Sequence, residues 1–195
     1  MRSSEPQGSS PTSRPLLLLT GELVALGPVE RAHAALHVRW LNDFATIRTL
    51  GSLPAPRTQE AMDALYQSAI VEQHDTFVFL TVYDRETLQP IGYATLQHVD
   101  RRTGTAELTL AIGEPSCRGR GYGTETVRLT LMFAFDHLGL HNVMLRYYAF
   151  NLAGQRAYEK AGFTEFARIR DGFTMGGRRW DIVLMEAVTS SPLRR

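Results

Sequence analysis

The stretch CRGRGYGTET, residues 117–126, decides the fold, because it places three glycines and two arginines in the six positions from Arg118 to Gly123. It follows a strand-like segment and precedes a run with helical periodicity. A glycine-rich turn at that place lets backbone N–H groups point into one concavity, and the start of the helix adds about half a positive charge. Phosphate oxygens match such a concavity. The stretch therefore predicts an anion site, with a turn that needs glycine only for its backbone geometry as the alternative.

The segments around this loop alternate between strand-like and helical patterns. Strands are expected at residues 16–26, 76–83, 91–99, 103–112, 142–150, 163–170 and 180–187. Helices are expected after Pro28, from the capping residue Thr58, after Gly123 and from the capping residue Asn151. Residues 44–57 read as a loop, since they contain Gly51, Pro54 and Pro56. The order β-α-α-β-β-β-α-β-α-β-β indicates an α/β (α+β) fold, an open mixed sheet with helices on its faces.

The hydrophobic periodicity also predicts which side chains face the core. The first helix is expected to bury Val29, Ala32, Leu36 and Trp40. The second helix is expected to turn inward Met62, Leu65 and Ala69. Strand 103–112 is expected to present Glu107, Thr109 and Ala111 on one face, and Leu108, Leu110 and Ile112 on the other.

The composition is that of an ordinary globular protein, with 44% hydrophobic and 21% charged residues. The 21 Lys and Arg against 20 Asp and Glu leave a formal charge of +1, which excludes the strong basic excess of a dedicated nucleic-acid binder. The single cysteine, Cys117, gives no reason to expect an oxidising compartment, so the cytoplasm is the default. The apolar run Leu16–Leu19 is too short for a signal peptide or a membrane span.

Both ends of the chain are predicted to be flexible tails. Residues 1–15 and 189–195 are rich in Ser and Pro and lack apolar periodicity, so they cannot bury enough surface to offset the entropy of ordering. Between them there is no repeat, linker or shift of composition. We therefore expect one domain over residues 16–188.

Two well-known phosphate loops fit residues 117–126 poorly. A Walker loop needs Gly-Lys-Ser/Thr at the start of the helix, whereas this chain has Gly123-Thr124 without a lysine. The dinucleotide fingerprint is GxGxxG, whereas the glycines here are spaced GxGxG. The next strand also ends in Asn151 instead of the acid that binds a ribose. A nucleotide hydrolase and a hydride-transfer enzyme are therefore disfavoured.

A third loop fits. Residues 118–123 (RGRGYG) resemble the [Gln/Arg]-x-x-Gly-x-[Gly/Ala] loop with which the GNAT (Gcn5-related) family of N-acetyltransferases holds the pyrophosphate of acetyl-coenzyme A. Residues 151–163 (NLAGQRAYEKAGF) resemble the second signature of that family, N-x-x-A-x-x-x-Y-E-K-x-G-F, although the small residue after Asn151 is shifted. Residues 105–125 and 171–188 look most like the branch that acetylates ribosomal-protein N-termini, spermidine and other small amines.

The resemblance implies a fold and a binding site. The fold would be a mixed, mostly antiparallel central sheet of about seven strands flanked by about four helices. Acetyl-CoA would be the co-substrate, without a metal, and the partner would be an amine, with no nucleic acid or membrane and with a monomer or homodimer as the assembly. The residues expected to hold acetyl-CoA are Leu110, Ala111, Ile112, Arg118, Gly119, Arg120, Gly121, Tyr122, Gly123, Thr124, Asn151 and Tyr158.

Two residues are candidates for catalysis. By resemblance, the Tyr158 hydroxyl points at the coenzyme sulfur as a general acid; the alternative is a core aromatic beside Ala157 and Ala161. Glu107 sits between apolar neighbours in a strand, a costly place for a carboxylate unless it is paired or used. It would receive the proton of the amine, directly or through water, or else hold a neighbouring element by hydrogen bonds.

Other chemistry-bearing residues receive simpler interpretations. Cys117 is expected to be a small buried thiol, and the pair His33 and His37 is expected on a helix surface without a third ligand. The residues suggested to line the acceptor site are Trp40, Asp43, Phe44, Tyr66, Asp171 and Phe173. A polyamine, an aminoglycoside-like drug or another cationic amine would need clustered acids there, and a peptide N-terminus would need an open groove. A protein of this fold that binds an acyl-CoA without catalysis, as a sensor or scaffold, is the alternative function.

Overall fold

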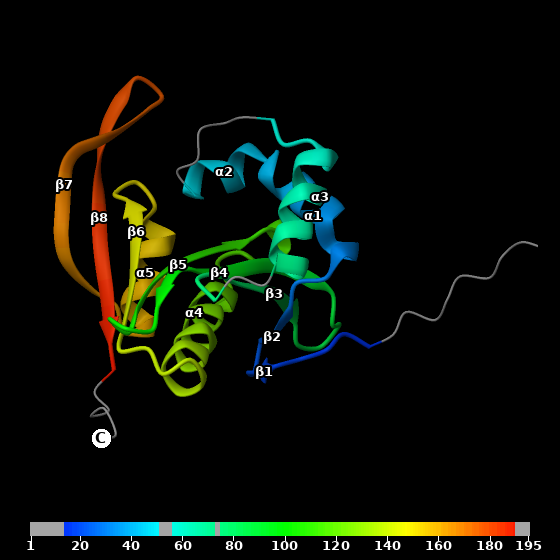
Figure 1. The fold of residues 1–195 in the computed structure, drawn as a ribbon. Coiled ribbons are helices and arrows are strands. Elements are labelled where there is room, and N and C mark those ends of the chain that lie inside the picture. Colours follow the sequence, from blue (N-terminus) through cyan, green and yellow to red (C-terminus); the bar gives the residue numbers. More distant parts are fainter. Residues whose placement is uncertain (1–13, 51–55, 73–74, 190–195) are drawn as a thin grey trace, which may run out of the picture.

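The computed structural model describes residues 14–50, 56–72 and 75–189 (Figure 1). Its strands are β1 (Leu19–Thr20), β2 (Val24–Pro28), β3 (Val78–Asp84), β4 (Pro90–Asp100), β5 (Thr105–Ile112), β6 (Asn142–Tyr148), β7 (Thr164–Met175) and β8 (Arg178–Val188). Its α-helices are α1 (Ala34–Leu41), α2 (Phe44–Leu50), α3 (Gln59–Gln67), α4 (Tyr122–Met132) and α5 (Leu152–Ala161). Shorter helical turns are η1 (Arg31–His33), η2 (Ser68–Glu72), η3 (Pro115–Cys117) and η4 (Phe133–His137). Most of both expected tails, residues 1–13 and 190–195, lies outside the described residues.

The strands form one eight-stranded sheet in the order β1-β2-β3-β4-β5-β6-β8-β7. Only β5 and β6 pair in parallel, and every other pair of neighbours is antiparallel. The predicted mixed, mostly antiparallel sheet is therefore confirmed. The expected single strand over residues 16–26 is wrong, because the chain turns after Thr20, where the Gly21 N–H donates to the Val24 carbonyl at 2.8 Å. This turn adds the eighth strand.

The parallel pair β5 and β6 opens along its length. Pairing runs only from Thr105–Glu107 on β5 to Asn142–Met144 on β6. Beyond Glu107, β5 still pairs with β4 up to Ile112, and β6 still pairs with β8 up to Tyr148. The second half of β5 therefore has no strand on its β6 side, and its backbone there resembles the open edge of a sheet.

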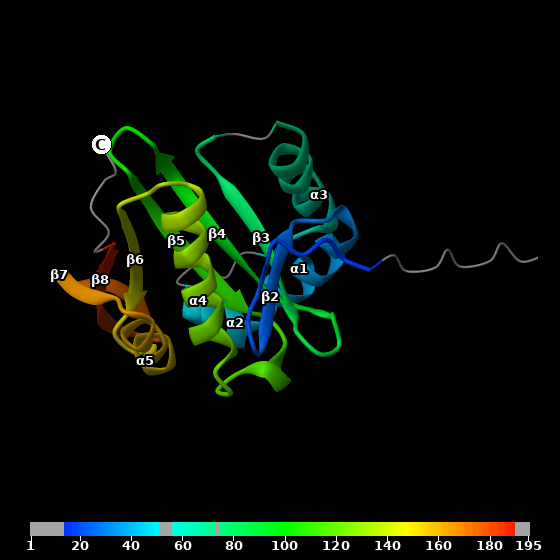
Figure 2. The same cartoon turned by 90° about the horizontal axis from the view of Figure 1, so that it is seen from below.

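Helices cover both faces of the sheet. Figures 1 and 2 show α1, α2 and α3 on one face and α4 and α5 on the other. Under α4 the core gathers residues such as Leu108, Val127 and Leu145, all at most 3% exposed. On the opposite face Trp40 packs with Tyr93 and Ala111. The predicted alternation along β5 is thus confirmed, because Leu108 and Ala111 belong to the cores of opposite faces.

The loop expected over residues 44–57 is wrong in its first half, which forms α2. The Asp43 carboxylate caps this helix by accepting hydrogen bonds from the N–H groups of Ala45 and Thr46, both at 3.2 Å, and from the Thr46 hydroxyl at 2.8 Å. With α2 the described residues hold five α-helices instead of about four. This helix contacts β5 and β6 at the place where the two strands separate.

The predicted inward faces of α1 and α3 are partly wrong. The turn η1 precedes α1, so the helix begins at Ala34 and buries Ala34, His37 and Trp40, whereas Ala32 is exposed. His37 was expected on a helix surface and is only 1% exposed. In α3 the buried residues are Met62 and Tyr66, and Leu65 is 44% exposed.

The predicted helix ends are confirmed at the positions where the chain offers a cap. The Thr58 hydroxyl accepts a hydrogen bond from the Ala61 N–H at 3.2 Å, and the Asn151 side chain accepts one from the Gly154 N–H at 2.9 Å. Gly139 and Gly162 follow the helices with positive φ angles of 69° and 103°. These caps fix where α3, α4 with its extension η4, and α5 begin or end.

Candidate functional site

The glycine loop needs its glycines for backbone geometry. Gly119 and Gly121 have φ angles of 72° and 93°, in the left-handed region that other residues enter at a cost. Gly121 is the N-cap of α4, and Gly123 lies in its first turn. The loop therefore delivers the free N–H groups at the start of an eleven-residue helix to the surface of a cavity, as an anion site requires.

That cavity, here called the loop cleft, has a volume of about 330 Å³ and lies between the end of β5, the glycine loop and the start of α5. Of the expected coenzyme-binding residues, those that line it are Leu110, Ala111, Ile112, Arg118, Gly119, Gly121, Gly123, Thr124, Asn151 and Tyr158. The structure thus brings together ten of the twelve expected residues. The sequence reasoning missed the contribution of α2, such as Thr46, and that of further α5 residues beside Tyr158, such as Arg156.

Three side chains of the loop do not have the position that a phosphate contact requires. The Arg118 guanidinium turns inward and donates to the carbonyls of Ile112 and Gly113 at 3.0 and 2.8 Å, and to the Thr46 hydroxyl at 2.7 Å. Arg120 and Tyr122 do not line the loop cleft, and the buried Tyr122 donates from its hydroxyl to Asp84 at 2.8 Å. What the loop offers to an anion is therefore mainly its backbone.

Arg118 instead joins the glycine loop to α2. Besides its bond to Thr46, its guanidinium lies 3.2 Å from the Asp43 carboxylate. The hydrogen bond from the Thr46 hydroxyl, with those from Ala45 and Arg118, lowers the pKa of Asp43. One arginine thereby fixes the position of the loop against the cap of a helix far away in the sequence.

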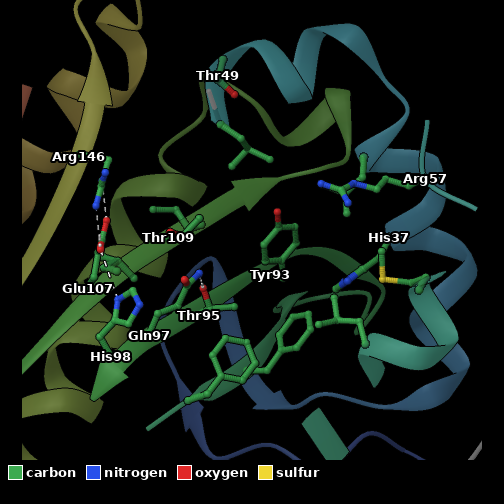
Figure 3. A pocket seen from close by; sticks show the side chains of 18 of the residues that line it. His37, Thr49, Arg57, Tyr93, Thr95, Gln97, His98, Glu107, Thr109 and Arg146 are labelled. Carbon is green, nitrogen blue, oxygen red and sulfur yellow. Dashed lines mark hydrogen bonds and ion pairs between the residues drawn. The ribbon is translucent and has the colours of Figure 1, made fainter. Parts of the chain in front are cut away.

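A second cavity, here called the large cavity, lies between the sheet and helices α1 to α3 (Figure 3). It has a volume of about 670 Å³. Aromatic and aliphatic side chains form most of its wall, among them Leu41, Met62, Phe77, Phe79 and Tyr93. The charged side chains along it are Arg57, Glu107 and Arg146, together with His98. A cavity of this size is suited to a small molecule or to the end of a peptide.

The two cavities meet at three residues. Thr49 of α2, Leu110 of β5 and Tyr158 of α5 line both of them in the described part of the chain. Tyr158 lies beside Tyr147 and Phe163, with ring centroids 5.8 and 6.2 Å apart. Burial, with a smaller contribution from Tyr147, raises the pKa of Tyr158 to about 12. Its hydroxyl therefore keeps its proton at neutral pH.

Glu107 stands at the edge of the large cavity in an ion pair. The Arg146 guanidinium donates to its two carboxylate oxygens at 2.8 and 3.2 Å, and the His98 Nδ1 lies 3.6 Å away (Figure 3). The Glu107 side chain is 22% exposed, so that solvent and cavity still reach it. A carboxylate between apolar neighbours in a strand was expected to be paired, and the partner of Glu107 is Arg146. The carboxylate also faces the cavity.

The six residues suggested to line the acceptor site are not among those that line the large cavity. Trp40 and Tyr66 belong to the core at 2% and 0% exposure, and Asp43 caps α2. Phe44 is 76% exposed, and Phe173 packs on Tyr148 with their ring centroids 4.1 Å apart. The wall of the large cavity comes from α1 to α3 and from β3, β4 and β5, and the alternation of Phe77 and Phe79 was one available signal for it.

Other expectations concern the single cysteine, which lines the loop cleft, and metal sites and membrane spans. Cys117 is buried at 8% exposure, as expected of a structural thiol. In the described residues no three His, Cys, Asp or Glu side chains come together as a metal site would require. No helix of the described residues is long and apolar enough to cross a membrane.

Comparison with known proteins supports what this geometry suggests. Residues 24–164 match the family model of the GNAT acetyltransferase domain. The chain is 29% identical over 139 residues to an uncharacterized N-acetyltransferase, YokL, of a Bacillus subtilis prophage, covering 71% of this chain and 76% of that protein. It is 30% identical over 163 residues to the human alpha/beta-tubulin-N-acetyltransferase 9, covering 77% and 76%.

The fold is also that of solved acetyltransferases. A spermidine N-acetyltransferase from Vibrio cholerae, solved in complex with CoA and spermine, superposes with a TM-score of 0.78 at 22% identity. The match covers 86% of this chain and 96% of that one. The family model, the relatives and the fold agree with the two sequence signatures. This chain therefore belongs to the GNAT family and is an N-acetyltransferase.

Proposed function

We propose that this enzyme binds acetyl-CoA in the loop cleft and transfers the acetyl group directly to an amine held in the large cavity. The observation that carries this proposal is the meeting of the two cavities at Thr49, Leu110 and Tyr158. A thioester entering from the loop cleft and an amine entering from the large cavity can come into contact there. Direct transfer in a ternary complex needs such a contact, and no covalent intermediate on the enzyme is required.

The loop cleft has the features that the coenzyme needs. The N–H groups from Gly119 to Thr124 would hold the diphosphate at the start of α4. The arm that carries the sulfur would run along Leu110–Ile112, where β5 has no partner strand on its β6 side and its backbone can pair with amides. Asn151, which caps α5, lines the same cleft and would touch this arm.

The acid and the base would come from the residues at the junction and at the edge of the large cavity. The amine nitrogen attacks the thioester carbon, the C–S bond breaks, and the departing sulfur accepts a hydrogen bond or a proton from the Tyr158 hydroxyl. The pKa of about 12 lies well above a thiol near 8.5, so Tyr158 acts mainly as a neutral donor to the developing charge. Glu107 would take the proton that the amine loses, directly or through water.

The test of this proposal is thiol release. The purified protein is incubated with acetyl-CoA, a panel of primary amines and a reagent that reports free thiol, and binding of the coenzyme is measured separately by calorimetry. We expect amine-dependent thiol release and a mass gain of one acetyl group on the amine. Coenzyme binding without release from any amine would contradict the proposal and favour a sensor or scaffold.

A matched pair of glycines tests the position of the diphosphate. Gly119 and Gly139 have φ angles of 72° and 69°, and an added Cβ would meet no atom within 4 Å at either position. Gly119→Ala and Gly139→Ala should therefore lose a similar free energy of unfolding, about 1 kcal/mol each. Only Gly119 lines the loop cleft, so only Gly119→Ala should weaken coenzyme binding, by about 10-fold. Equal coenzyme affinities of the two variants would place the diphosphate elsewhere.

The assembly stays a prediction. We expected a monomer or a homodimer, and one of the solved neighbours, a spermidine N-acetyltransferase from Vibrio cholerae, is dodecameric. Light scattering of the purified protein decides among these states.

A further inference from the structure

The charges of the large cavity differ from those that a polyamine needs. Among its described wall residues the only carboxylate is Glu107, and that carboxylate is held by Arg146. Arg57 adds a second guanidinium to the wall. Spermidine carries about three positive charges at neutral pH, because its amines have pKa values near that of lysine. Bringing such a molecule into a cavity with an excess of arginine would be opposed by like charges.

The backbone of Arg57 is held in place, and its exposed side chain lines the cavity. The Asn42 side chain fixes the backbone of Arg57 at both groups, accepting from its N–H at 2.9 Å and donating to its carbonyl at 2.8 Å. The guanidinium itself makes no hydrogen bond or ion pair within the described ranges. Figure 3 shows it directed toward Tyr93, across the cavity from Glu107 and Arg146.

The field of Arg57 reaches the floor of the cavity. Burial raises the pKa of Tyr93 to about 12, and the positive charge of Arg57 acts in the opposite direction and lowers it. The floor around Tyr93 is otherwise apolar or neutral, with His37, Phe79 and Met62. Desolvation by this floor lowers the pKa of His37 to about 3, so the imidazole adds no charge at neutral pH. Among the described residues, Arg57 thus has no ion-pair partner at its side of the largely apolar cavity.

Resting on the proposed function, we infer that the acceptor is a monoamine with an apolar body and a carboxylate, and that Arg57 binds this carboxylate. A guanidinium matches a carboxylate with two parallel hydrogen bonds, which sets the orientation of the ligand as well as its affinity. The apolar body lies on the floor that Phe79 and Tyr93 form together, and the amine points to the junction at Tyr158. Free amino acids and short peptides with an acidic residue share this chemistry.

The test compares acceptors that carry this carboxylate with acceptors in which it is an amide. Phenylalanine and phenylalaninamide form one pair, and tetrapeptides with an amidated C-terminus and glutamate or glutamine at the second position form another; spermidine is the third arm. In the wild-type enzyme we expect kcat/KM for the carboxylate member of at least one pair to exceed that of its amide and of spermidine by about 10-fold or more. The pair that shows the difference tells whether the acceptor is a free amino acid or a peptide.

The variants locate the preference at Arg57. Arg57→Gln should abolish it, Arg57→Lys should keep part of it, and Arg57→Glu should favour the amide and spermidine. Arg85→Gln is the control, because Arg85 is equally exposed, follows β3 at its far end and lines neither cavity. A calorimetric titration of the carboxylate ligand into the CoA-loaded protein gives a readout that does not depend on turnover.

The outcomes separate this inference from the proposed function. Acetylation of amines with no preference for a carboxylate, or with a preference that survives in Arg57→Gln, overturns the inference and leaves the proposed function standing. If no amine is acetylated, the proposed function fails, and the titration still decides: binding that is lost in Arg57→Gln supports the carboxylate site, and equal binding overturns it.

Discussion

A Tyr158→Phe variant is expected to lose about 100-fold in kcat while its affinity for the coenzyme stays within about 2-fold of the wild type. The change removes one oxygen at the junction of the two cavities and leaves the ring that packs on Tyr147 and Phe163. We place the loss at the lower end of the usual range for an acid catalyst, because a pKa of about 12 makes full proton transfer to a thiolate unfavourable.

The control for this variant is its neighbour. Tyr147→Phe also removes a phenol oxygen, but Tyr147 is 3% exposed in the core and lines neither cavity. Its kcat should stay close to that of the wild type, even if its free energy of unfolding falls. Stopped-flow single-turnover measurements on the true acceptor separate the chemical step from product release. Full activity of Tyr158→Phe in that experiment would rule out the acid role.

The second large effect concerns stability in acid. His37 is buried among Trp40, Tyr66, Phe79 and Tyr93, with ring centroids between 4.9 and 5.4 Å, and its Nε2 has no hydrogen-bond partner in the described structure. Burial, with a smaller contribution from His33, lowers the pKa of His37 to about 3. In the unfolded chain the His37 imidazole has a pKa of about 6.5, so below this pH the unfolded chain binds a proton that the folded protein does not bind.

The sign and the size of this effect follow from that difference. The contribution of His37 to the free energy of unfolding should be fully present above pH 6.5. It should fall by up to about 1.4 kcal/mol per pH unit as the pH drops toward the pKa of His37 in the folded protein. Between pH 6.5 and pH 5 the loss from His37 alone is about 2 kcal/mol. Urea unfolding of wild type, His37→Phe and His141→Gln checks this, since His141 is exposed. His37→Phe should show the shallower slope, and parallel slopes in all three proteins would mean that His37 is not the group responsible.

Most of the fold could be predicted because its elements depend on residues that are close in the sequence. The order of strands and helices, the caps at Thr58 and Asn151, and the alternation of β5 follow from neighbouring residues. The helix α2 was missed although Asp43 is a good capping residue, because Gly51, Pro54 and Pro56 nearby were given more weight. Punctuating residues just after a helix mark its end and do not exclude it.

The parts of the site that could not be predicted depend on contacts between distant segments. The inward turn of the Arg118 side chain follows from its contacts to Thr46 and Asp43, whose place beside the loop is fixed only by the fold. The same holds for the pairing of Glu107 with Arg146, and for the burial of His37, which depends on a turn that shifts the start of α1. Sequence patterns predicted the loop and Tyr158 as site residues, whereas the charges around the large cavity required the three-dimensional arrangement.

The three residues that line both cavities also bear on which acyl donors the enzyme can use. If the thioester lies beside Thr49, Leu110 and Tyr158, every carbon beyond the acetyl methyl must extend past these residues into the large cavity, where the amine is proposed to bind. A longer acyl chain would contact the apolar wall of the large cavity and bind well. It would, however, exclude the amine from that cavity. Selectivity for short acyl donors would then arise because the acyl chain and the amine compete for the same volume. It would not require a side chain that blocks longer acyl chains.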